Sequence, residues 1–377
     1  MIKVELPKVG DDTRAWGPPF LQDVSIGASS KESAYYLGAN RGKRSITVDI
    51  ASGEGQSLLR ELAKHCDVCI ENFKVGGLKK YGLDYESLRS VNPRIIYASI
   101  SGFGQDGPRS HQAGYDFAIQ AMGGLMSITG EQGGIPLKVG VAVTDIMTGM
   151  YTVSGILAAV VHRDRTGVGQ YIDNSLFDTQ LAFLANQGMN YLVGGKSPSR
   201  IGNQHPNIVP YSTFQTKDGF FIVVTVGNDN QFKQLCQLLN VPRLASSEDG
   251  NDKFSTNAKR VTNREELYAL LGERFARQPR QHFLDLLNKT SIPHSPVNTI
   301  EEAFRDEQAV HRGATVTMEH PLNPELKLIA NPLRFSETPV TYDRPPPMLG
   351  QHTNEVLSTV LKLSDKDIAE LRQKGVV

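Results

Sequence analysis

The chain has 377 residues, of which 39% are hydrophobic and 21% are charged, the composition of a soluble globular protein of roughly two or three domains. Lys and Arg together number 40, and Asp and Glu also number 40, so the formal net charge is zero. This balance argues against bulk charge attraction to nucleic acid or to an anionic membrane, and we expect neither as a partner.

The first part of the chain alternates short apolar strands with helices. Strand patterns occur at residues 2–6, 45–50, 67–72 and 94–100, and helical patterns at 53–65 and 84–91. This β-α-β-α-β order is typical of an α/β fold with a doubly wound parallel sheet and helices on both faces. Further helices are predicted at 115–127, 144–162 and 175–192, with a strand at 170–173 before the last of them.

The predicted helix at 144–162 contains the longest uncharged apolar run, the 16 residues from 146 to 161. A membrane span needs about 20 such residues. Because the run also contains Thr148, Thr152 and two glycines, it predicts a buried core helix and not a membrane span.

Around residue 200 the pattern changes to that of a smaller α+β domain, which we predict at 212–315. It begins with a hairpin at 214–226. Helical patterns follow at 230–239, 264–274, 280–289 and 299–311. Beyond this domain, Pro345–Pro347 predict an extended strap, and 353–374 a helical tail.

The cysteines, histidines and glycine motifs do not predict a disulfide scaffold, a metal site or a dinucleotide site. Cys66, Cys69 and Cys236 are too few for a disulfide scaffold and indicate a reducing, intracellular compartment. The first two have CxxC spacing, but without a second pair we interpret them as ordinary thiols near a helix-to-strand junction. The nine histidines form no HxH or HExxH pair, so no metal site is expected. The GxGxxG match at 102–107 runs into Pro108 and is interpreted as an ordinary glycine turn.

The first candidate catalytic group lies where a strand runs into a helix. Ser175 fits an N-cap, which places Asp178 in the first helical turn, where backbone N–H groups favour an ionised carboxylate. A carboxylate at this edge of a sheet is able to attack an activated acyl group. The same Ser-x-x-Asp spacing fits a capping box, which on spacing alone is the commoner explanation. Asp173, on the strand itself, is the alternative nucleophile.

A second candidate site is the glycine and lysine turn at 71–80, which follows a predicted strand. Ligands of open α/β sheets bind beyond the carboxyl ends of the strands. Backbone N–H groups of a glycine turn with three lysines nearby suit phosphate groups. A solvated loop with ordinary surface charge explains the same residues equally well.

Several motifs together resemble those of class III CoA-transferases, in the order seen in that family. They are GDDTR at 10–14, NRGKRS at 40–45, ENF at 71–73, AGYD at 113–116, GQYIDNSLFD at 169–178, PY at 210–211 and PMLGQHT at 347–353. The resemblance covers essentially the whole chain. Within the family, the chain is most similar to the succinyl-CoA:glutarate branch.

The resemblance implies a large domain formed by 1–205 and by a return segment at 320–377, with the smaller domain between them. It implies an interlocked homodimer in which each chain threads through the other. It also implies that Asp178 is the nucleophile and carries an aspartyl-CoA intermediate. The substrates would be an acyl-CoA such as succinyl-CoA and a small carboxylic or dicarboxylic acid such as glutarate. No tightly bound cofactor is expected, since coenzyme A enters as a thioester substrate.

The family's CoA contacts carry over to five positions. They are Val48, Asn72, Phe73, Lys80 and Tyr115. Phe73 would flank the adenine, and Lys80 stands where relatives often have Arg, so it offers a point charge without the bidentate fork. Tyr115 replaces the His of the racemases of this fold. Because Tyr is a poor base near neutral pH, an acyl-CoA racemase or isomerase is the less favoured alternative.

Relatives have a further strand and helix before the first motif, and we expect this unit of the large domain to be missing from the sequence. A truncated, catalytically silent subunit is therefore a second alternative. Glutarate chemistry in a eukaryote would indicate the mitochondrial matrix, although no targeting segment is visible. In a bacterium it would indicate the cytoplasm.

Overall fold

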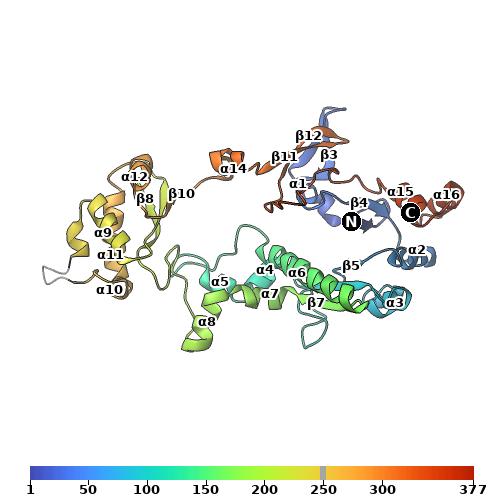
Figure 1. Cartoon of the computed structure of the whole chain (residues 1–377), viewed down its shortest axis with the longest axis horizontal. Coiled ribbons are helices and arrows are strands. Elements are labelled where there is room, and N and C mark those ends of the chain that lie inside the picture. The colour runs from blue at the N-terminus through green and yellow to red at the C-terminus, as the bar shows by residue number, and fades with distance from the viewer. Residues whose placement is uncertain (247–251) are drawn as a thin grey trace. The chain divides into compact units, whose positions relative to one another are not determined.

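The computed structural model describes residues 1–246 and 252–377, which divide into two compact units. Unit 1 comprises Met1–Tyr115, Asp145–Thr179 and Glu302–Val377, and unit 2 comprises Asp116–Thr144 and Gln180–Glu301. Figure 1 gives the order of the elements along the chain. Both chain ends belong to unit 1.

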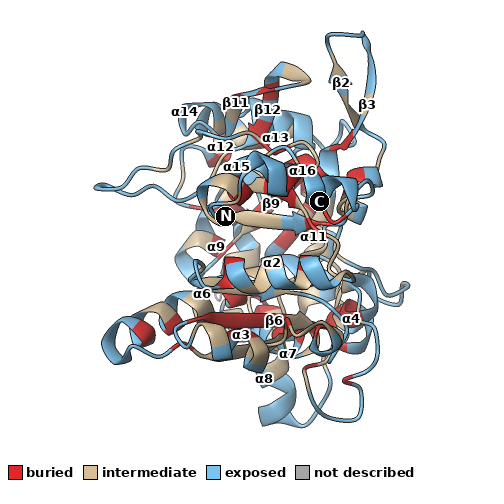
Figure 2. Ribbon diagram, turned by 90° about the vertical axis from the view of Figure 1, so that its right-hand side faces the viewer, coloured by how far each residue is buried: buried red, intermediate tan, exposed pale blue. Residues whose placement is uncertain are grey.

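The parallel strands of unit 1 confirm the predicted α/β fold class. β1 (Ile2–Glu5) pairs with β4 (Arg44–Thr47), while β5 (Val68–Glu71), β6 (Ile96–Ser101) and β7 (Tyr171–Ser175) form a second sheet in that order. All these pairs are parallel, but the strands lie in two sheets where the sequence predicts one. β6 is buried along most of its length (Figure 2), because its apolar side chains are covered on both faces.

Helix α2 (Gly53–Ala63) joins the cores that lie against the two parallel sheets. Its N-cap Ser52 accepts a hydrogen bond from the N–H of Gly55, which defines where the helix begins. Leu62 packs in the cluster around β4, Ala63 packs in the cluster around β6, and Leu59 contacts both. The apolar face of α2 therefore packs against both core clusters. Helix α3 (Tyr85–Val91) precedes β6, as predicted.

The prediction that 144–162 is a buried core helix was wrong. Helix α6 (Val143–Thr166) has two opposite stripes. The inner stripe is small and polar, and the outer stripe is apolar and 51–61% exposed. The inner residues are Thr148, Thr152, Gly155, Ala159 and Arg163; the outer ones are Ile146, Met150, Val153, Leu157 and Val161. By length and composition alone the helix could cross a membrane, and 22% of its apolar window is buried. Its inner stripe packs on β7, where Gly155 faces Ile172.

Three long helical predictions are each divided by a residue in the left-handed region. Gly124 separates α4 (Asp116–Met122) from α5 (Leu125–Ile128). Ala185, at φ 46°, is the first residue of α8 (Ala185–Gly194), where the chain breaks from α7 (Leu176–Phe183), and Lys362, at φ 59°, lies between α15 (Thr353–Thr359) and α16 (Asp365–Gln373). Glycine signals such a break, whereas Ala and Lys do not.

Unit 2 contains the predicted hairpin within a three-stranded antiparallel sheet. Its strands are β8 (Tyr211–Gln215), β9 (Phe221–Thr225) and β10 (His294–Pro296). Its helices after β9 are α9 (Asp229–Leu238), α10 (Asn257–Thr262), α11 (Arg264–Phe275) and α12 (Arg280–Leu287). Helix α13 (Ile300–Arg305) begins at the end of unit 2 and continues into unit 1. Apolar residues of the sheet and helices form one core, in which Phe214 stacks on Phe275.

Several elements of unit 1 have no counterpart in the sequence prediction. They are η1 (Asp12–Ala15), β2 (Phe20–Asp23), β3 (Ala28–Ser33) and α1 (Ala34–Ala39) near the N-terminus. Later in the chain, α13 and α14 (Glu307–His311) fall within the helix predicted at 299–311, and the hairpin of β11 (Thr315–His320) and β12 (Asn323–Ile329) follows them.

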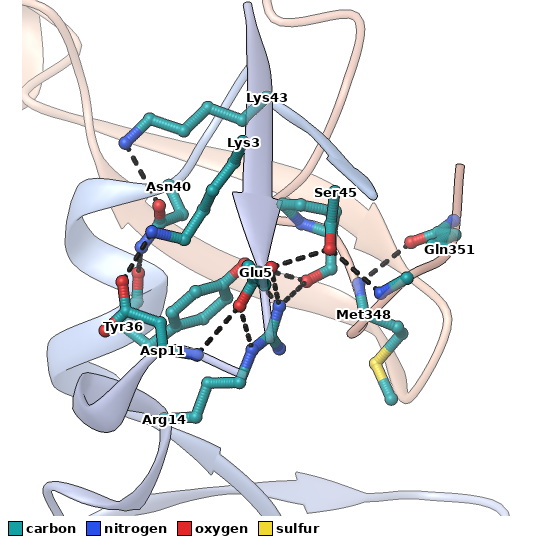
Figure 3. A network of polar contacts seen from close by, with 12 residues as sticks. Lys3, Glu5, Asp11, Arg14, Tyr36, Asn40, Lys43, Ser45, Met348 and Gln351 are labelled. Atoms are coloured by element: carbon teal, nitrogen blue, oxygen red, sulfur yellow. Dashed lines mark hydrogen bonds and ion pairs between the residues drawn. The ribbon is translucent and has the colours of Figure 1, made fainter. Parts of the chain in front are cut away.

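A buried ionic network holds the N-terminal elements together (Figure 3). The Arg14 guanidinium donates two hydrogen bonds of 2.9 Å to Glu5, one from Nε and one from Nη2. Its Nη1 donates to both carboxylate oxygens of Glu32, at 2.8 and 2.7 Å. Tyr36 and Arg14 each donate to the carbonyl of Pro347, at 3.1 and 3.2 Å. The network therefore ties β1, β3 and α1 to the proline strap.

Two carboxylates share this single guanidinium, and their pKa values move in opposite directions. Burial would raise the pKa of Glu5, but hydrogen bonds from Arg14 and Ser45 hold it below its usual value. Burial raises the pKa of Glu32, and the attraction of Arg14 offsets this only in part. The charge of Arg14 is therefore necessary for both side chains to remain buried.

We predict that Arg14→Met lowers the free energy of unfolding by about 3–5 kcal/mol, because it leaves two buried carboxylates without their cation. The midpoint of urea denaturation measures this loss. Arg94→Met is the matched control, since the Arg94 side chain is 55% exposed and lies 3.9 Å from Asp164. Its effect should stay within about 0.5 kcal/mol. Equal midpoints for the two variants would contradict the prediction.

Candidate active site

The predicted site residues follow strands whose ends lie at one edge of the β5-β6-β7 sheet. β5 is followed by Asn72 and Phe73, β6 by Gly102, and β7 by the first turn of α7, which contains Asp178. Because the strands are parallel, their carboxyl ends meet at this edge, where open α/β sheets bind ligands.

Asp178 is exposed, and Ser175 beneath it is 2% exposed. The N–H of Asp178 donates to Ser175 Oγ at 3.0 Å, which is the N-cap bond expected from the sequence. The Ser175 hydroxyl in turn donates to Asp178 Oδ2 at 2.7 Å. Within residues 1–246 and 252–377, Asp178 Oδ1 has no hydrogen-bond partner. The carboxylate is thus held by one oxygen and accessible through the other.

Asn174 fixes the turn from below. Its Nδ2 donates to the carbonyl of Thr148 at 3.0 Å and to Thr152 Oγ1 at 2.9 Å, both on the inner stripe of α6. Its Oδ1 accepts a hydrogen bond from Thr179 Oγ1 at 3.2 Å. The amide therefore ties β7, α6 and α7 together at the base of the Asp178 turn.

Gly102 brings the turn at the start of α7 close to the segment of Tyr115. The N–H of Phe177 donates to the carbonyl of Gly102 at 3.1 Å. A Cβ on Gly102 would lie 2.6 Å from the amide nitrogen of Gly114, so the two backbones touch there. Tyr115 follows directly and is 73% exposed. The structure thus brings together the predicted positions of Tyr115 and the nucleophile.

A family model described as CoA-transferase family III matches residues 1–353. The chain belongs to this family. It is 48% identical to the succinate–glutarate CoA-transferase of Agrobacterium fabrum, covering 95% of this chain and 88% of the relative. It is 43% identical to the human succinyl-CoA:glutarate CoA-transferase, covering 100% and 83% respectively.

Solved structures agree with this assignment. A CaiB/BaiF family protein from Brucella suis matches with 48% identity and a TM-score of 0.82, covering 95% of this chain and 90% of that one. Rv3272 from Mycobacterium tuberculosis matches with 26% identity and a TM-score of 0.79, covering 94% and 90%. The chain is therefore an enzyme that transfers CoA, and enzymes of this family use CoA thioesters as substrates.

In this CoA-transferase, the turn after β5 presents the next predicted residues. The N–H of Phe73 donates to Glu71 Oε2 at 2.7 Å, and the Ser99 hydroxyl binds the other carboxylate oxygen. Glu71 therefore fixes the turn that exposes Asn72 and Phe73, the latter by 48%. Lys80 is also exposed, with its Nζ 4.6 Å from the ring centre of Tyr81.

A cavity of about 270 Å³ lies between this turn, the start of α3, the middle of β6 and the first residue of β7. Lys74 and Lys79 line it together with Tyr97 and Tyr171. Glu71, Asp84 and Glu86 line it too, so the lining charges are mixed and not purely cationic. Anion binding by the backbone of this turn stays a prediction.

Val48 lies apart from the exposed candidates. It is 2% exposed and packs in the core cluster beside β4, while its N–H donates to the carbonyl of Glu5 at 2.9 Å. The position follows β4, as a CoA contact would require, but the side chain itself is a core residue.

The alternative nucleophile Asp173 is already hydrogen-bonded to another turn, and two of the cysteine thiols are poor nucleophiles. Asp173 Oδ2 accepts a hydrogen bond from the N–H of Gln105 at 3.0 Å, so this carboxylate holds the 102–107 turn in place. That turn opens no helix, as the sequence analysis expected. Burial raises the pKa values of Cys69 and Cys236 to about 12, so both thiols stay protonated and weakly nucleophilic at neutral pH.

No group of three or more His, Cys, Asp or Glu able to hold a metal ion occurs in the part of the chain that the structure describes. Three functional features were missed from the sequence. They are the amide bridge of Asn174, the contact between Gly102 and Gly114, and the bond from Ser175 to the carboxylate. Asn174 and Ser175 both lie within the motif at 169–178. The partners of Asn174 on α6 are distant in sequence, and the bond from Ser175 to Asp178 depends on how the two side chains are oriented.

We predict that Gly102→Ala lowers stability by about 1–3 kcal/mol and reduces activity, because the new methyl group would press into the backbone of Gly114. Thermal unfolding and CoA-exchange assays measure the two effects. Gly38→Ala is the control: it lies in α1 with open space around it, and Ala favours helix. A Gly102→Ala variant as active and stable as Gly38→Ala would contradict the packing argument.

Proposed function

We propose that this enzyme moves CoA between succinyl-CoA and small dicarboxylic acids of the glutarate class, with Asp178 as the nucleophile. The observation that carries the proposal is the exposed Asp178 carboxylate, with Oδ1 unbonded within the described residues, at the carboxyl edge of the sheet. Relatives at 48% and 43% identity are named for succinate, or succinyl-CoA, and glutarate, which supports this acid pair.

The chemistry follows from a carboxylate attacking a thioester. An Asp178 oxygen bonds to the acyl carbon of the donor and expels CoA as its thiolate, leaving a mixed anhydride. The thiolate then attacks Asp178 Cγ, releases the donor acid and leaves an aspartyl-CoA thioester. The acceptor carboxylate attacks the same carbon, forms a second anhydride and again frees the thiolate. That thiolate takes the acceptor acyl group and restores the carboxylate.

For CoA itself we propose contacts at Asn72, Phe73, Lys80 and Tyr115, which are all exposed, and at the backbone of Val48. The half-exposed ring of Phe73 offers a face for the adenine, and Lys80 offers a cation for phosphate. We retain the domain bounds 1–205, 212–315 and 320–377 as part of the proposal. A mitochondrial matrix location in a eukaryote also stays a prediction.

We predict that Asp178→Asn abolishes exchange of labelled CoA between succinyl-CoA and free glutarate, because the amide is not nucleophilic. Asp173→Asn is the control, since its amide oxygen is still able to accept the bond from Gln105. It should keep most of its activity. Undiminished exchange in Asp178→Asn would overturn the proposed function.

We also propose a homodimer. The outer stripe of α6 places Ile146, Met150, Val153 and Leu157 at alternating spacings of four and three residues, which presents one continuous apolar face. Such a face is costly in water, and a second copy of the chain supplies a cover of matching character.

We predict that the wild-type chain migrates as a dimer in size-exclusion chromatography with light scattering, and that Leu157→Glu shifts it towards the monomer. The introduced charge would be buried against the partner's apolar surface. Gln373→Glu adds the same charge at an exposed position of α16 and should leave the dimer intact. A monomeric wild-type protein at micromolar concentration would refute the homodimer.

A further inference from the structure

Among the residues that the structure describes, two Ser-x-x-Asp pairs begin helices, and the two pairs differ in one hydrogen bond. At α16 the pair is Ser364 and Asp367. The N–H of Asp367 donates to Ser364 Oγ at 3.2 Å, and Asp367 Oδ2 accepts from the N–H of Ser364 at 3.1 Å. The Ser364 hydroxyl also donates to this oxygen, at 2.6 Å. This is a closed capping box on an exposed helix end.

At α7 the box is open. The N–H of Asp178 donates to Ser175 Oγ, but across the described ranges the Asp178 carboxylate accepts no bond from the N–H of Ser175. The Ser175 hydroxyl is the one group there that binds the carboxylate, at 2.7 Å to Oδ2. Ser175 is 2% exposed, whereas Asp178 is exposed.

The hydroxyl of Ser175 has a single proton, and the positions of its two hydrogen-bond partners determine which of them receives it. Its oxygen accepts the N–H of Asp178, which fixes the orientation of the hydroxyl, and the proton points to Oδ2. A hydrogen bond from a buried donor to a charged oxygen is stronger than an exposed neutral one. The two carboxylate oxygens are therefore inequivalent before any substrate binds.

We propose that Ser175 is a catalytic residue, whose hydroxyl directs Asp178 to attack through Oδ1 and stabilises the negative charge that develops on Oδ2. The inference rests on the proposed function, because it needs Asp178 as the nucleophile. It assigns to Ser175 a role beyond that of an N-cap.

Ser175 stabilises charge in the two steps in which Cγ of Asp178 is attacked, because the electron pair then moves onto Oδ2. In the first anhydride, Oδ1 is bonded to the donor acyl carbon and Oδ2 is the aspartyl carbonyl oxygen. When the CoA thiolate attacks Cγ, the carbonyl electron pair moves onto Oδ2, where the Ser175 hydroxyl donates to it. The pair then returns, the Cγ–Oδ1 bond breaks, and the donor acid leaves with Oδ1. Attack by the acceptor carboxylate repeats the same charge movement, and no net proton is transferred.

The experiment compares Ser175→Ala with Ser364→Ala, which removes an N-cap with the same Ser-x-x-Asp spacing at the start of α16. Each full-length variant is mixed with succinyl-CoA without acceptor, and the gain of one CoA by the intact protein is followed by rapid-quench mass spectrometry. We expect Ser175→Ala to form the adduct about 10²-fold more slowly, as for loss of one oxyanion donor. Ser364→Ala should match wild type.

Thermal unfolding of both Ala variants separates capping from catalysis, because each loses one N-cap bond and should lose similar stability. Ser175→Thr retains a hydroxyl and should recover most of the adduct rate. If Ser175→Ala does not fold, the isosteric Ser175→Cys takes its place, with a weak donor and a similarly slow rate.

The outcomes distinguish this inference from the function on which it rests. A wild-type adduct rate in a folded Ser175→Ala or Ser175→Cys variant, with none in Asp178→Asn, would overturn the role of Ser175 and leave the proposed function standing. Adduct formation in Asp178→Asn at the wild-type rate would instead overturn the proposed function.

Discussion

The parallel pairing of β5, β6 and β7 is the constraint on which the candidate active site depends. It aligns three strand ends at one edge, so that short turns bring Phe73, Gly102 and Asp178 into one region of unit 1. Each turn is then fixed by a polar group. Glu71 holds the first, Asp173 holds the second, and Asn174 and Ser175 hold the third. Phe73 and Asp178, which the proposed reaction uses, remain exposed on these turns.

The Ser175 hydroxyl can act both as the N-cap of α7 and as a catalytic group, because the two roles use different parts of the hydroxyl. Ser175 accepts a backbone N–H with its oxygen and donates its proton to the carboxylate, so helix initiation and orientation of the proposed nucleophile use different parts of one group. In the closed capping box at Ser364, the backbone N–H of Asp367 donates to the serine hydroxyl, and the backbone N–H of Ser364 donates to the aspartate carboxylate. In the open box at Ser175, the hydroxyl of this buried serine makes the one bond to the carboxylate that is found in the described part of the chain.

Two features away from the candidate active site contrast with each other: Arg14 forms a buried cluster of charges, and α6 exposes an apolar stripe. The guanidinium of Arg14 gathers two carboxylates and the carbonyl of Pro347, so residues more than 300 positions apart share one buried cation. Helix α6 instead turns its small and polar stripe towards β7 and leaves its apolar stripe exposed. The first arrangement is complete within the chain, and the second is the physical ground for the proposed dimer.

The sequence alone determined the family and many of the local elements. Alternating patterns predicted β5, α2 and β6 to within a few residues, and the motif at 169–178 placed a carboxylate at a strand end. It did not reveal the division of long helices at Ala185 and Lys362, because neither residue signals a left-handed backbone. It did not indicate which stripe of α6 is buried, since a threonine face and an apolar face have the same period. Only the tertiary structure decided these points, together with the inequivalence of the two Asp178 oxygens, because they depend on contacts and orientations that spacing along the chain does not specify.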